Sequence, residues 1–494
     1  MHAEMLIDGH FVGGPCDQGV GKQVVRQPGT DKIVGTAAEG GWSEANAAIE
    51  AARDAFRIWR NSTGRERQAL LRKIAALVRE RSEELSLLLC REVGKPITWA
   101  RGETMRLGLT FDLAADTLEG YGHEELSLDY DPRGKGYTCT VERFPIGPIL
   151  AIVPYNWPYN LAAHKLAPAL AVGNTVVLKP SQQAPLSTLT LARLIHEAGC
   201  PPGVLNAVNV PGGIAEKMAL DDRVKMVSFT GSPVVGWKLK GLLPGKRVSL
   251  ELGGNAYAIV CADADLDWAA ERIIAGGYGY AGQICIAIQH VLAHDAIYED
   301  LKKRLIEGTE NCPTGDVEDE KTVCGPLISE EAAKKVEEWV QEAVTAGANI
   351  LAGGKREGAF MWPTLVEVSP PPAPSPFAGT SHPENGEGVP RLLCQEVFGP
   401  VVTLESYKTE DRAIKQVNSG EYGINTGIFT KDRSMGEKAF RELEVGAVIV
   451  NDYPTLRFDI MPYGGVKKSG FGREGLRYAM DEMTELKAMV NRGD

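Results

Sequence analysis

The sequence has little of what a disulfide-stabilised, membrane-spanning or nucleic-acid-binding protein needs. Its nine cysteines form no Cys-x-x-Cys pair and no regular spacing with histidine, so we expect neither a disulfide framework nor a metal site. No apolar run approaches the roughly 18 residues of a membrane span, and residues 1–10, with Glu4 and Asp8, are not of the signal type. The net charge of -12 is spread along the chain without a basic stretch. These absences predict a soluble protein of the reducing cytoplasm with no nucleic acid and no membrane partner.

The chain does contain enough apolar side chains for several cores. With 494 residues, 44% of them hydrophobic, we expect two or three domains at about 100–200 residues each. The first part has helical patterns: Ser43 is a candidate N-cap for a helix that runs to Trp59, and Thr63 with Glu66 forms a capping box for the next helix. Residues 126–143 alternate around a turn at 131–134, which predicts a long hairpin.

From Gly147 onward, short apolar runs alternate with helical stretches, an order typical of a parallel, doubly wound sheet. The runs are Pro148–Val153, Thr175–Leu178, Val204–Val208, Lys225–Phe229 and Arg247–Leu250. A second α/β region is expected from about Leu252, beginning with a strand at Ala256–Cys261. Residues 370–390 are rich in Pro, Gly and Ser and predict a surface loop. The predicted fold class is therefore α/β.

Cys285 differs from the other cysteines in its surroundings. It follows Gly282 in a loop where backbone N–H groups can reach a substrate, and Glu251 supplies a carboxylate ahead of Gly253 and Gly254. A thiolate that attacks a carbonyl needs donors for the developing oxyanion, and later a base that activates water against the thioester. Asn156, directly after the predicted strand 148–153, offers a side-chain donor, although alone it would be read as a turn residue.

Seven short motifs resemble those of the aldehyde dehydrogenase superfamily. They occur in the same order as in that family and extend over nearly the whole chain. They are Pro154–Pro158, Lys179–Ser181, Phe229–Ser232, Glu251–Gly254, Gly282–Cys285, Glu396–Pro400, and Pro462–Lys467 with Ser469 and Gly470. The resemblance implies that Cys285 is the nucleophile and that the Asn156 side chain and the Cys285 backbone N–H form the oxyanion hole. It implies further that Glu251 activates the water that hydrolyses the thioester.

The resemblance also implies a bound NAD or NADP. Lys179 would bind the adenosine ribose, Gly231, Ser232 and Gly236 would lie near the pyrophosphate, and Glu396 and Phe398 would hold the nicotinamide ribose and ring. The full expected set of cofactor-binding residues is Val153, Pro154, Lys179, Ser181, Gln182, Gly212, Phe229, Gly231, Ser232, Val235, Gly236, Leu252, Glu396 and Phe398.

Two departures from the family pattern bear on specificity. Many NAD-preferring members carry Glu three residues after the lysine, and here that position is Gln182. A carboxylate there binds the 2′-hydroxyl and repels a 2′-phosphate, so its loss favours NADP, unless Gln182 simply hydrogen-bonds the same ribose hydroxyls. His290 replaces an arginine that often follows the nucleophile, and its effect on specificity stays open.

The stretch 451–465 is similar to dehydrogenases of lactaldehyde, phosphonoacetaldehyde and, of the non-phosphorylating kind, glyceraldehyde 3-phosphate. Arg457 and Arg106 are candidates for holding a small anionic or hydroxylated aldehyde by charge-assisted hydrogen bonds, with Trp157 and Ile284 beside it. The alternative is that both arginines lie at the surface, paired with Asp459 or Glu103. Triose-phosphate-specific members place Arg immediately before the nucleophile, and Ile284 at that position speaks against a phosphorylated substrate.

The family's architecture would divide the chain into a cofactor-binding domain (1–122 and 144–251), a catalytic domain (252–447), an oligomerisation element (123–143 and 484–494) and a return segment (448–483). The projecting hairpin exposes sheet edges that a second subunit would cover, so a homodimer or homotetramer is expected. Two alternative functions are a coenzyme-A-acylating relative, which generally lacks the base, and a non-catalytic structural member, which needs none of these side chains.

Overall fold

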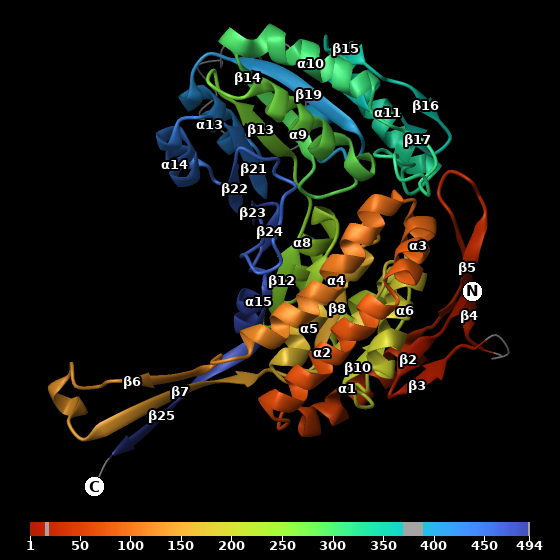
Figure 1. Ribbon diagram of the computed structural model, residues 1–494. Coiled ribbons are helices and arrows are strands. Elements are labelled where there is room, and N and C mark those ends of the chain that lie inside the picture. Colours follow the sequence, from red (N-terminus) through yellow and green to blue (C-terminus); the bar gives the residue numbers. More distant parts are fainter. Residues whose placement is uncertain (15–18, 369–388, 493–494) are drawn as a thin grey trace.

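Two α/β lobes and a long projecting arm make up the molecule in the computed structural model, which describes residues 1–14, 19–368 and 389–492. In Figure 1 the first lobe holds the helices from the N-terminal half of the chain, and the second lobe lies above it. The arm extends away from the first lobe and carries the C-terminal end of the chain.

An eight-stranded sheet forms the centre of the first lobe, in the order β24-β12-β11-β8-β9-β10-β2-β3. Its five central strands are parallel and confirm the five predicted apolar runs to within two residues at either end. They are β8 (Ile149–Ile152), β9 (Val176–Lys179), β10 (Leu205–Ala207), β11 (Met226–Thr230) and β12 (Arg247–Glu251). The antiparallel edges are β2 (Met5–Ile7), β3 (His10–Val12) and β24 (Gly470–Phe471).

Both faces of this sheet are buried, which is why its strands are continuous apolar runs rather than alternating ones. Along β8, Ile149 and Ala151 pack on one core, whereas Leu150 and Ile152 pack on the other. Helices α2, α3, α4, α5, α6 and α15 contribute to the first core, and α1, α7 and α8 to the second. Their bounds are α1 (Trp42–Trp59), α2 (Gly64–Glu80), α3 (Ser82–Val93), α4 (Ile97–Thr117), α5 (Pro158–Ala171), α6 (Pro185–Glu197), α7 (Gly212–Leu220), α8 (Pro233–Leu242) and α15 (Leu476–Glu482).

The predicted starts of the first two helices have different outcomes. The prediction that Ser43 caps α1 is wrong: the N-cap is Gly41, whose backbone N–H donates to the Glu44 carboxylate at 2.7 Å. Glycine has no side chain that could reveal this cap in the sequence. The capping box of Thr63 and Glu66 at the start of α2 is confirmed, with both reciprocal bonds present.

A seven-stranded sheet forms the second lobe, in the order β15-β18-β19-β14-β13-β21-β22. All neighbours are parallel except β15 with β18, and the predicted strand at Ala256–Cys261 is confirmed as β13. The strands are β13 (Ala256–Val260), β14 (Ile288–His294), β15 (Asn349–Ala352), β18 (Thr364–Glu367), β19 (Val401–Tyr407), β21 (Asn425–Phe429) and β22 (Ala447–Val450). The helices are α9 (Leu266–Tyr278), α10 (Tyr298–Glu310), α11 (Glu330–Thr345), α12 (Arg391–Cys394), α13 (Glu410–Ser419) and α14 (Arg433–Glu442). The predicted loop at 370–390 lies almost wholly outside the described residues.

The arm consists of β6 (His123–Leu126), β7 (Tyr137–Pro145) and β25 (Thr484–Arg492), paired antiparallel in the order β25-β7-β6. The predicted hairpin is confirmed, although it starts at His123 and runs on to Pro145. Smaller sheets join β1 (His2–Ala3), β5 (Ile33–Glu39) and β4 (Gly21–Arg26), β16 (Arg356–Glu357) and β17 (Phe360–Met361), and β20 (Tyr422–Gly423) and β23 (Val466–Lys467). Within the described ranges, no helix is both long and apolar enough to cross a lipid bilayer.

Candidate active site

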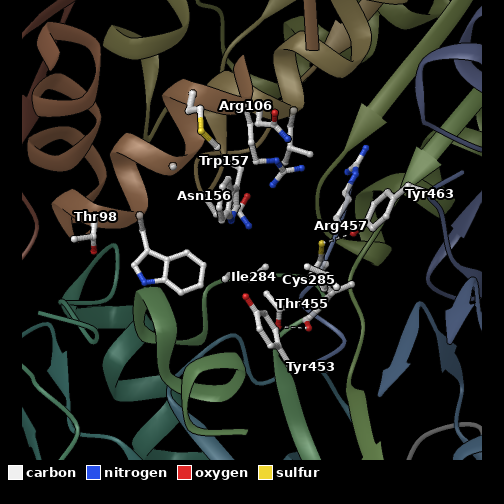
Figure 2. A pocket seen from close by; sticks show the side chains of 17 residues that line it. Thr98, Arg106, Asn156, Trp157, Ile284, Cys285, Tyr453, Thr455, Arg457 and Tyr463 are labelled. Atoms are coloured by element: carbon white, nitrogen blue, oxygen red, sulfur yellow. Dashed lines mark hydrogen bonds between the residues drawn. The ribbon is translucent and has the colours of Figure 1, made fainter. Parts of the chain in front are cut away.

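A cavity of about 440 Å³ lies where the two lobes meet, and six of the seven predicted catalytic and substrate-binding residues line it. From the first lobe come α4 and the start of α5, and from the second come the loop before β14 and the segment after β22. Figure 2 shows Cys285 beside Tyr463 and Arg457, with Asn156 and Trp157 on the other side of the open space. The predicted residues that line the cavity are Cys285, Asn156, Arg106, Trp157, Ile284 and Arg457.

The loop that carries Cys285 is fixed by its backbone. Tyr280, Ala281 and Gly282 have positive φ angles of 51°, 52° and 66°, which produces a tight turn after α9. A side chain at Gly282 would place its Cβ 2.2 Å from the carbonyl oxygen of Gly399, so only glycine fits there. The turn brings Cys285 to the cavity wall, directly ahead of β14.

The thiol of Cys285 has one side-chain partner among the described residues. The hydroxyl of Tyr463 lies 3.0 Å from Sγ. Loss of water around the sulfur raises the pKa of Cys285 to about 12; Tyr463 and Arg457 act to lower it, whereas the Glu396 and Glu251 carboxylates act to raise it.

Asn156 stands directly after β8 and is only 4% exposed. Its Nδ2 donates to the backbone carbonyl of Gln283 at 2.9 Å, which ties the asparagine to the nucleophile loop. An amide carries two N–H groups, and this bond uses one of them. The other is what an oxyanion beside Cys285 would require.

Glu251 is the last residue of β12 and is 2% exposed, yet it does not belong to the cavity wall itself. In the described part of the chain, neither carboxylate oxygen has a hydrogen-bond partner. A side chain at Gly464 would place its Cβ 2.8 Å from Oε1, so the absence of a side chain there is what allows the backbone to pack this closely against the carboxylate. Burial and the nearby Glu474 carboxylate raise the pKa of Glu251 well above its usual range.

Two buried ion-pair groups lie behind the cavity. Glu474 pairs with Lys165 at 2.7 Å and with Arg457 at 3.4 Å. Burial alone would raise the pKa of Glu474, but these two cations lower it to about 2. Asp459 pairs with Arg106 at 2.5 Å and with His164 at 2.9 Å. Burial lowers the pKa of His164 to about 4, so this ring is neutral at pH 7.

The sequence left open that Arg106 and Arg457 are surface residues paired with Asp459 or Glu103. Arg457 is not at the surface: its side chain is 5% exposed, its partner is Glu474, and its guanidinium lies 3.7 Å from the centre of the Tyr463 ring. Its Nε is buried with no hydrogen-bond partner among the described residues. Arg106 does pair with Asp459, but it also faces the cavity from α4, 5.6 Å from the Trp157 ring.

The residues expected to bind the cofactor follow the carboxyl edge of the first sheet, where ligands of open α/β sheets bind. Lys179 ends β9 and is 7% exposed; burial alone lowers the pKa of its ammonium to about 8, and no carboxylate within the described ranges pairs with it. A buried ammonium without an anionic partner suits a polyhydroxylated, phosphorylated ligand.

The other residues expected to bind the cofactor extend from the carboxyl edge of the first sheet to the second lobe. Gly231 and Ser232 precede α8, where the Ser232 side chain accepts from the N–H of Val235. Gly236 is packed so closely on Leu252 that a Cβ would stand 2.4 Å from it. Val153, Phe229 and Leu252 are buried, whereas Gly212, Gln182, Ser232 and Val235 are exposed and Pro154, Ser181 and Gly231 are intermediate.

Glu396 and Phe398 approach from the second lobe. Oε1 of Glu396 accepts from the backbone N–H of Gly254 at 3.1 Å, and a Cβ on Gly253 would stand 2.1 Å from Oε2. Burial raises the pKa of Glu396 to about 7. Phe398, with a φ of 53°, packs its ring edge-on against Tyr155 at 6.1 Å. The residues present therefore fit a dinucleotide lying between the lobes.

The sequence analysis did not predict that a carboxylate lies next to Gln182. The side-chain amide of Gln182 donates to Oε1 of Glu39, the last residue of β5, at 3.1 Å. The neutral side chain at position 182 is thus next to a negative charge supplied by a different strand. His290, in contrast, is not at the site: it lies inside the second sheet, where Nδ1 contacts the Thr403 hydroxyl at 2.7 Å.

Tyr463 and Glu474 are further residues that sequence reasoning missed. The signal for Tyr463 was present, because it belongs to one of the seven motifs. The partners of Glu474 lie 309 and 17 positions away, so only the fold brings them together.

Comparisons with known proteins agree with this geometry. The sequence pattern of the aldehyde dehydrogenase family matches residues 17–375 and 385–489. The chain is 41% identical over 448 residues to 3-sulfolactaldehyde dehydrogenase of Priestia aryabhattai, covering 90% of each chain. It is 37% identical to lactaldehyde dehydrogenase of Methanocaldococcus jannaschii, covering 90% of this chain and 92% of that one. Among solved structures, NADP-dependent glyceraldehyde-3-phosphate dehydrogenase of Bacillus halodurans, complexed with NADP, superposes with a TM-score of 0.92 at 33% identity over the full length of both chains.

Proposed function

The chain belongs to the aldehyde dehydrogenase family, an assignment from which we propose that it oxidises a small anionic aldehyde to the carboxylate through a thioester on Cys285. That it is an oxidoreductase acting on small aldehydes with a pyridine nucleotide follows from the family and its named relatives. The observation that carries the finer proposal is the cavity in which a thiol, an amide donor and two arginines converge.

The residues of the chain divide the reaction into two steps. In the first step the Cys285 thiolate adds to the aldehyde carbon, and the oxyanion accepts hydrogen bonds from the Asn156 amide and the Cys285 backbone N–H. The bound nicotinamide supplies the acceptor for the hydride that leaves this thiohemiacetal. In the second step Glu251 takes a proton from water, which attacks the thioester and releases the carboxylic acid and the thiol. One aldehyde, one oxidised cofactor and one water thus give one carboxylate, one reduced cofactor and two protons.

Glu251 suits the second step because of its environment. A carboxylate with no hydrogen-bond partner in the described structure is a stronger base than a solvated one, and its pKa is raised accordingly. This base also separates hydrolysis from the alternative in which coenzyme A resolves the thioester, because a thiol acceptor needs no activated water.

The cavity has an excess of positive charge. Arg106 and Arg457 line it, whereas no carboxylate among the described residues does; their partners Asp459 and Glu474 lie behind the wall, and His164 is neutral. A substrate with one anionic group would pair with the arginines on this wall. The name of the relative from Priestia aryabhattai denotes such a substrate, with a sulfonate next to a hydroxylated aldehyde.

For the cofactor we infer binding across the carboxyl edge of the first sheet, with Lys179, Gly231, Ser232 and Glu396 as principal contacts. Because Gln182 carries no charge, we propose that NADP is accepted as well as NAD and that NADP is preferred. Glu39 reduces this advantage, since its carboxylate lies against the Gln182 amide.

The arm offers a surface for a second copy of the chain. Leu486, Met489 and Val490 on β25 are each more than half exposed, and an exposed strand with apolar side chains is a site for pairing. We propose a homodimer or homotetramer formed through this arm. We also infer a cytoplasmic location, because a nucleophilic thiol has to stay reduced.

The test is a panel of aldehydes of similar size, run with NAD and with NADP in parallel and followed by the absorbance of the reduced cofactor. Anionic three- and four-carbon aldehydes are expected to exceed uncharged lactaldehyde in kcat/KM. An equal response to charged and uncharged aldehydes would contradict the anionic substrate, and a reaction that requires added coenzyme A would contradict hydrolysis.

A further inference from the structure

Tyr463 occupies a position beside the nucleophile for which the reaction described above assigns no role. Its hydroxyl lies 3.0 Å from Sγ of Cys285, as the dashed line between them in Figure 2 marks. The residue is 3% exposed and lines the same cavity as the thiol. This contact joins two residues 178 positions apart, so the fold itself brings the hydroxyl to the sulfur.

The ring of Tyr463 is held from two sides. Its backbone N–H donates to the Glu474 carbonyl at 3.0 Å, and the Glu474 N–H returns a bond of 2.7 Å to the Tyr463 carbonyl. The Arg457 guanidinium covers the ring at 3.7 Å, and Arg457 is itself paired with the Glu474 carboxylate. A hydroxyl on a ring fixed in this way is a preorganised donor, because little reorganisation is needed when charge appears on the sulfur.

The direction of the hydrogen bond follows from the protonation states. Burial raises the pKa of Tyr463 well above its usual value, so the phenol keeps its proton at neutral pH. A thiolate has no proton to give and can only accept. Once the thiol proton has left to water in the cavity, the contact therefore becomes O–H···S⁻, which stabilises the thiolate before it attacks the carbonyl.

The other charged groups that face the sulfur do not remove the need for such a donor. The carboxylates of Glu396 and Glu251 oppose a negative charge on Cys285, and Arg457 favours it. Arg457 is shared with Glu474 and with the ring of Tyr463, which spreads its charge over several neighbours. Tyr463 is the side chain within hydrogen-bond distance of the sulfur in the described structure.

We propose that Tyr463 is a further catalytic residue, whose hydroxyl donates to Sγ of Cys285 and stabilises the thiolate that begins the reaction. This inference rests on the proposed role of Cys285 as nucleophile. It requires no substrate to be tested, because the thiolate can be titrated directly.

The test measures the rate of iodoacetamide alkylation of Cys285 against pH in the full chain, with peptide mass spectrometry to follow this cysteine alone. In Tyr463→Phe the ring under Arg457 is kept and only the hydroxyl is lost. We expect the apparent pKa of Cys285 to rise by about one unit, so that alkylation below that pKa slows about tenfold, which corresponds to 1.36 kcal/mol. Because burial holds this pKa at about 12, both proteins are compared at pH values at which they stay folded, where the rate is proportional to the thiolate fraction.

Tyr278→Phe is the matched control. Tyr278 is also a buried tyrosine whose hydroxyl meets another side chain, Thr309 at 3.0 Å, but it does not contact Cys285. The control is expected to leave the titration of Cys285 unchanged. Should Tyr463→Phe fail to fold, Tyr463→Met removes the same hydroxyl and is measured in its place.

An unchanged titration of Cys285 in a folded Tyr463 variant would overturn the inference. That outcome differs from failure of the proposed function, which would appear as turnover that persists when Cys285 is absent. A second readout is the pH profile of kcat/KM, whose rising limb should move to higher pH in Tyr463→Phe together with the alkylation curve.

Discussion

The amide of Gln182 donates to the Glu39 carboxylate at 3.1 Å, although the two residues are 143 positions apart in the chain. The region expected to receive the adenosine ribose therefore has a negative charge next to Gln182, supplied by β5 of a separate sheet, and the ammonium of Lys179 at the end of β9. In the proposed binding mode, the balance of these charges decides how well a 2′-phosphate is tolerated.

Gln182→Glu adds a second carboxylate to this edge and should weaken NADP far more than NAD. A like-charge contact in a partly solvated site is worth on the order of 1–4 kcal/mol, which is roughly a tenfold to several-hundredfold change in relative affinity. Dissociation constants of both cofactors for wild type and variant measure the effect. Gln183→Glu adds the same charge one residue further on, at an exposed position, and is the control. An NADP-to-NAD ratio that stays constant in Gln182→Glu would show that this side chain does not face the ribose.

Arg457→Gln removes one of the two cations that line the cavity while leaving Glu474 paired with Lys165. Hydrogen bonds to charged groups contribute roughly 1.5–3 kcal/mol, so kcat/KM for an anionic aldehyde should fall about 10- to 150-fold. Uncharged lactaldehyde should lose much less. Steady-state kinetics with both substrates decide the point, and equal losses for both would mean that Arg457 acts on the fold or on Tyr463 rather than on the substrate's charge.

Cys285→Ala should abolish aldehyde oxidation while the fold and cofactor binding persist, because Cys285 is the only covalent participant assigned. Cys394 is the matched control: it is also partly exposed and unpaired, but it lies in α12 and does not line the cavity. Cys394→Ala is expected to keep its turnover. Substantial oxidation by Cys285→Ala would exclude the thioester route.

The pH dependence of deacylation follows from the environment of Glu251. Burial and Glu474 raise its pKa, so at a given pH more of it is protonated than of an ordinary carboxylate. Only the ionised form can act as base, so deacylation should speed up as pH rises through this raised pKa and slow as pH falls below it. Stopped-flow measurement of the steady rate after the first turnover, repeated across the pH range, tests this. A deacylation rate independent of pH would mean that another group is the base.

Much of the fold could be predicted because each parallel strand is buried on both faces and therefore forms an unbroken apolar run. The convergence of Cys285, Asn156, Arg106 and Arg457 on one cavity also agrees with the sequence-based expectation. What the sequence could not provide were partners set by the fold. Glu39 reaches Gln182 from another strand, Glu474 meets Lys165 across 309 positions, and the hydroxyl of Tyr463 lies beside the nucleophile. The sequence allowed Arg457 to be a surface residue. Its burial depends on α5 and on the segment around Glu474, and only the fold brings these beside it.

The central claim, a thioester on Cys285 that Glu251 helps to hydrolyse, is tested most directly in Glu251→Gln. The amide resembles the protonated carboxyl that burial favours at this position, so the variant is expected to fold. Mixed with cofactor and an accepted aldehyde, it should give a single burst of reduced cofactor, and acid-quenched peptide mass spectrometry should find the acyl group on Cys285. A full burst of reduced cofactor with Cys285 unmodified would contradict the account.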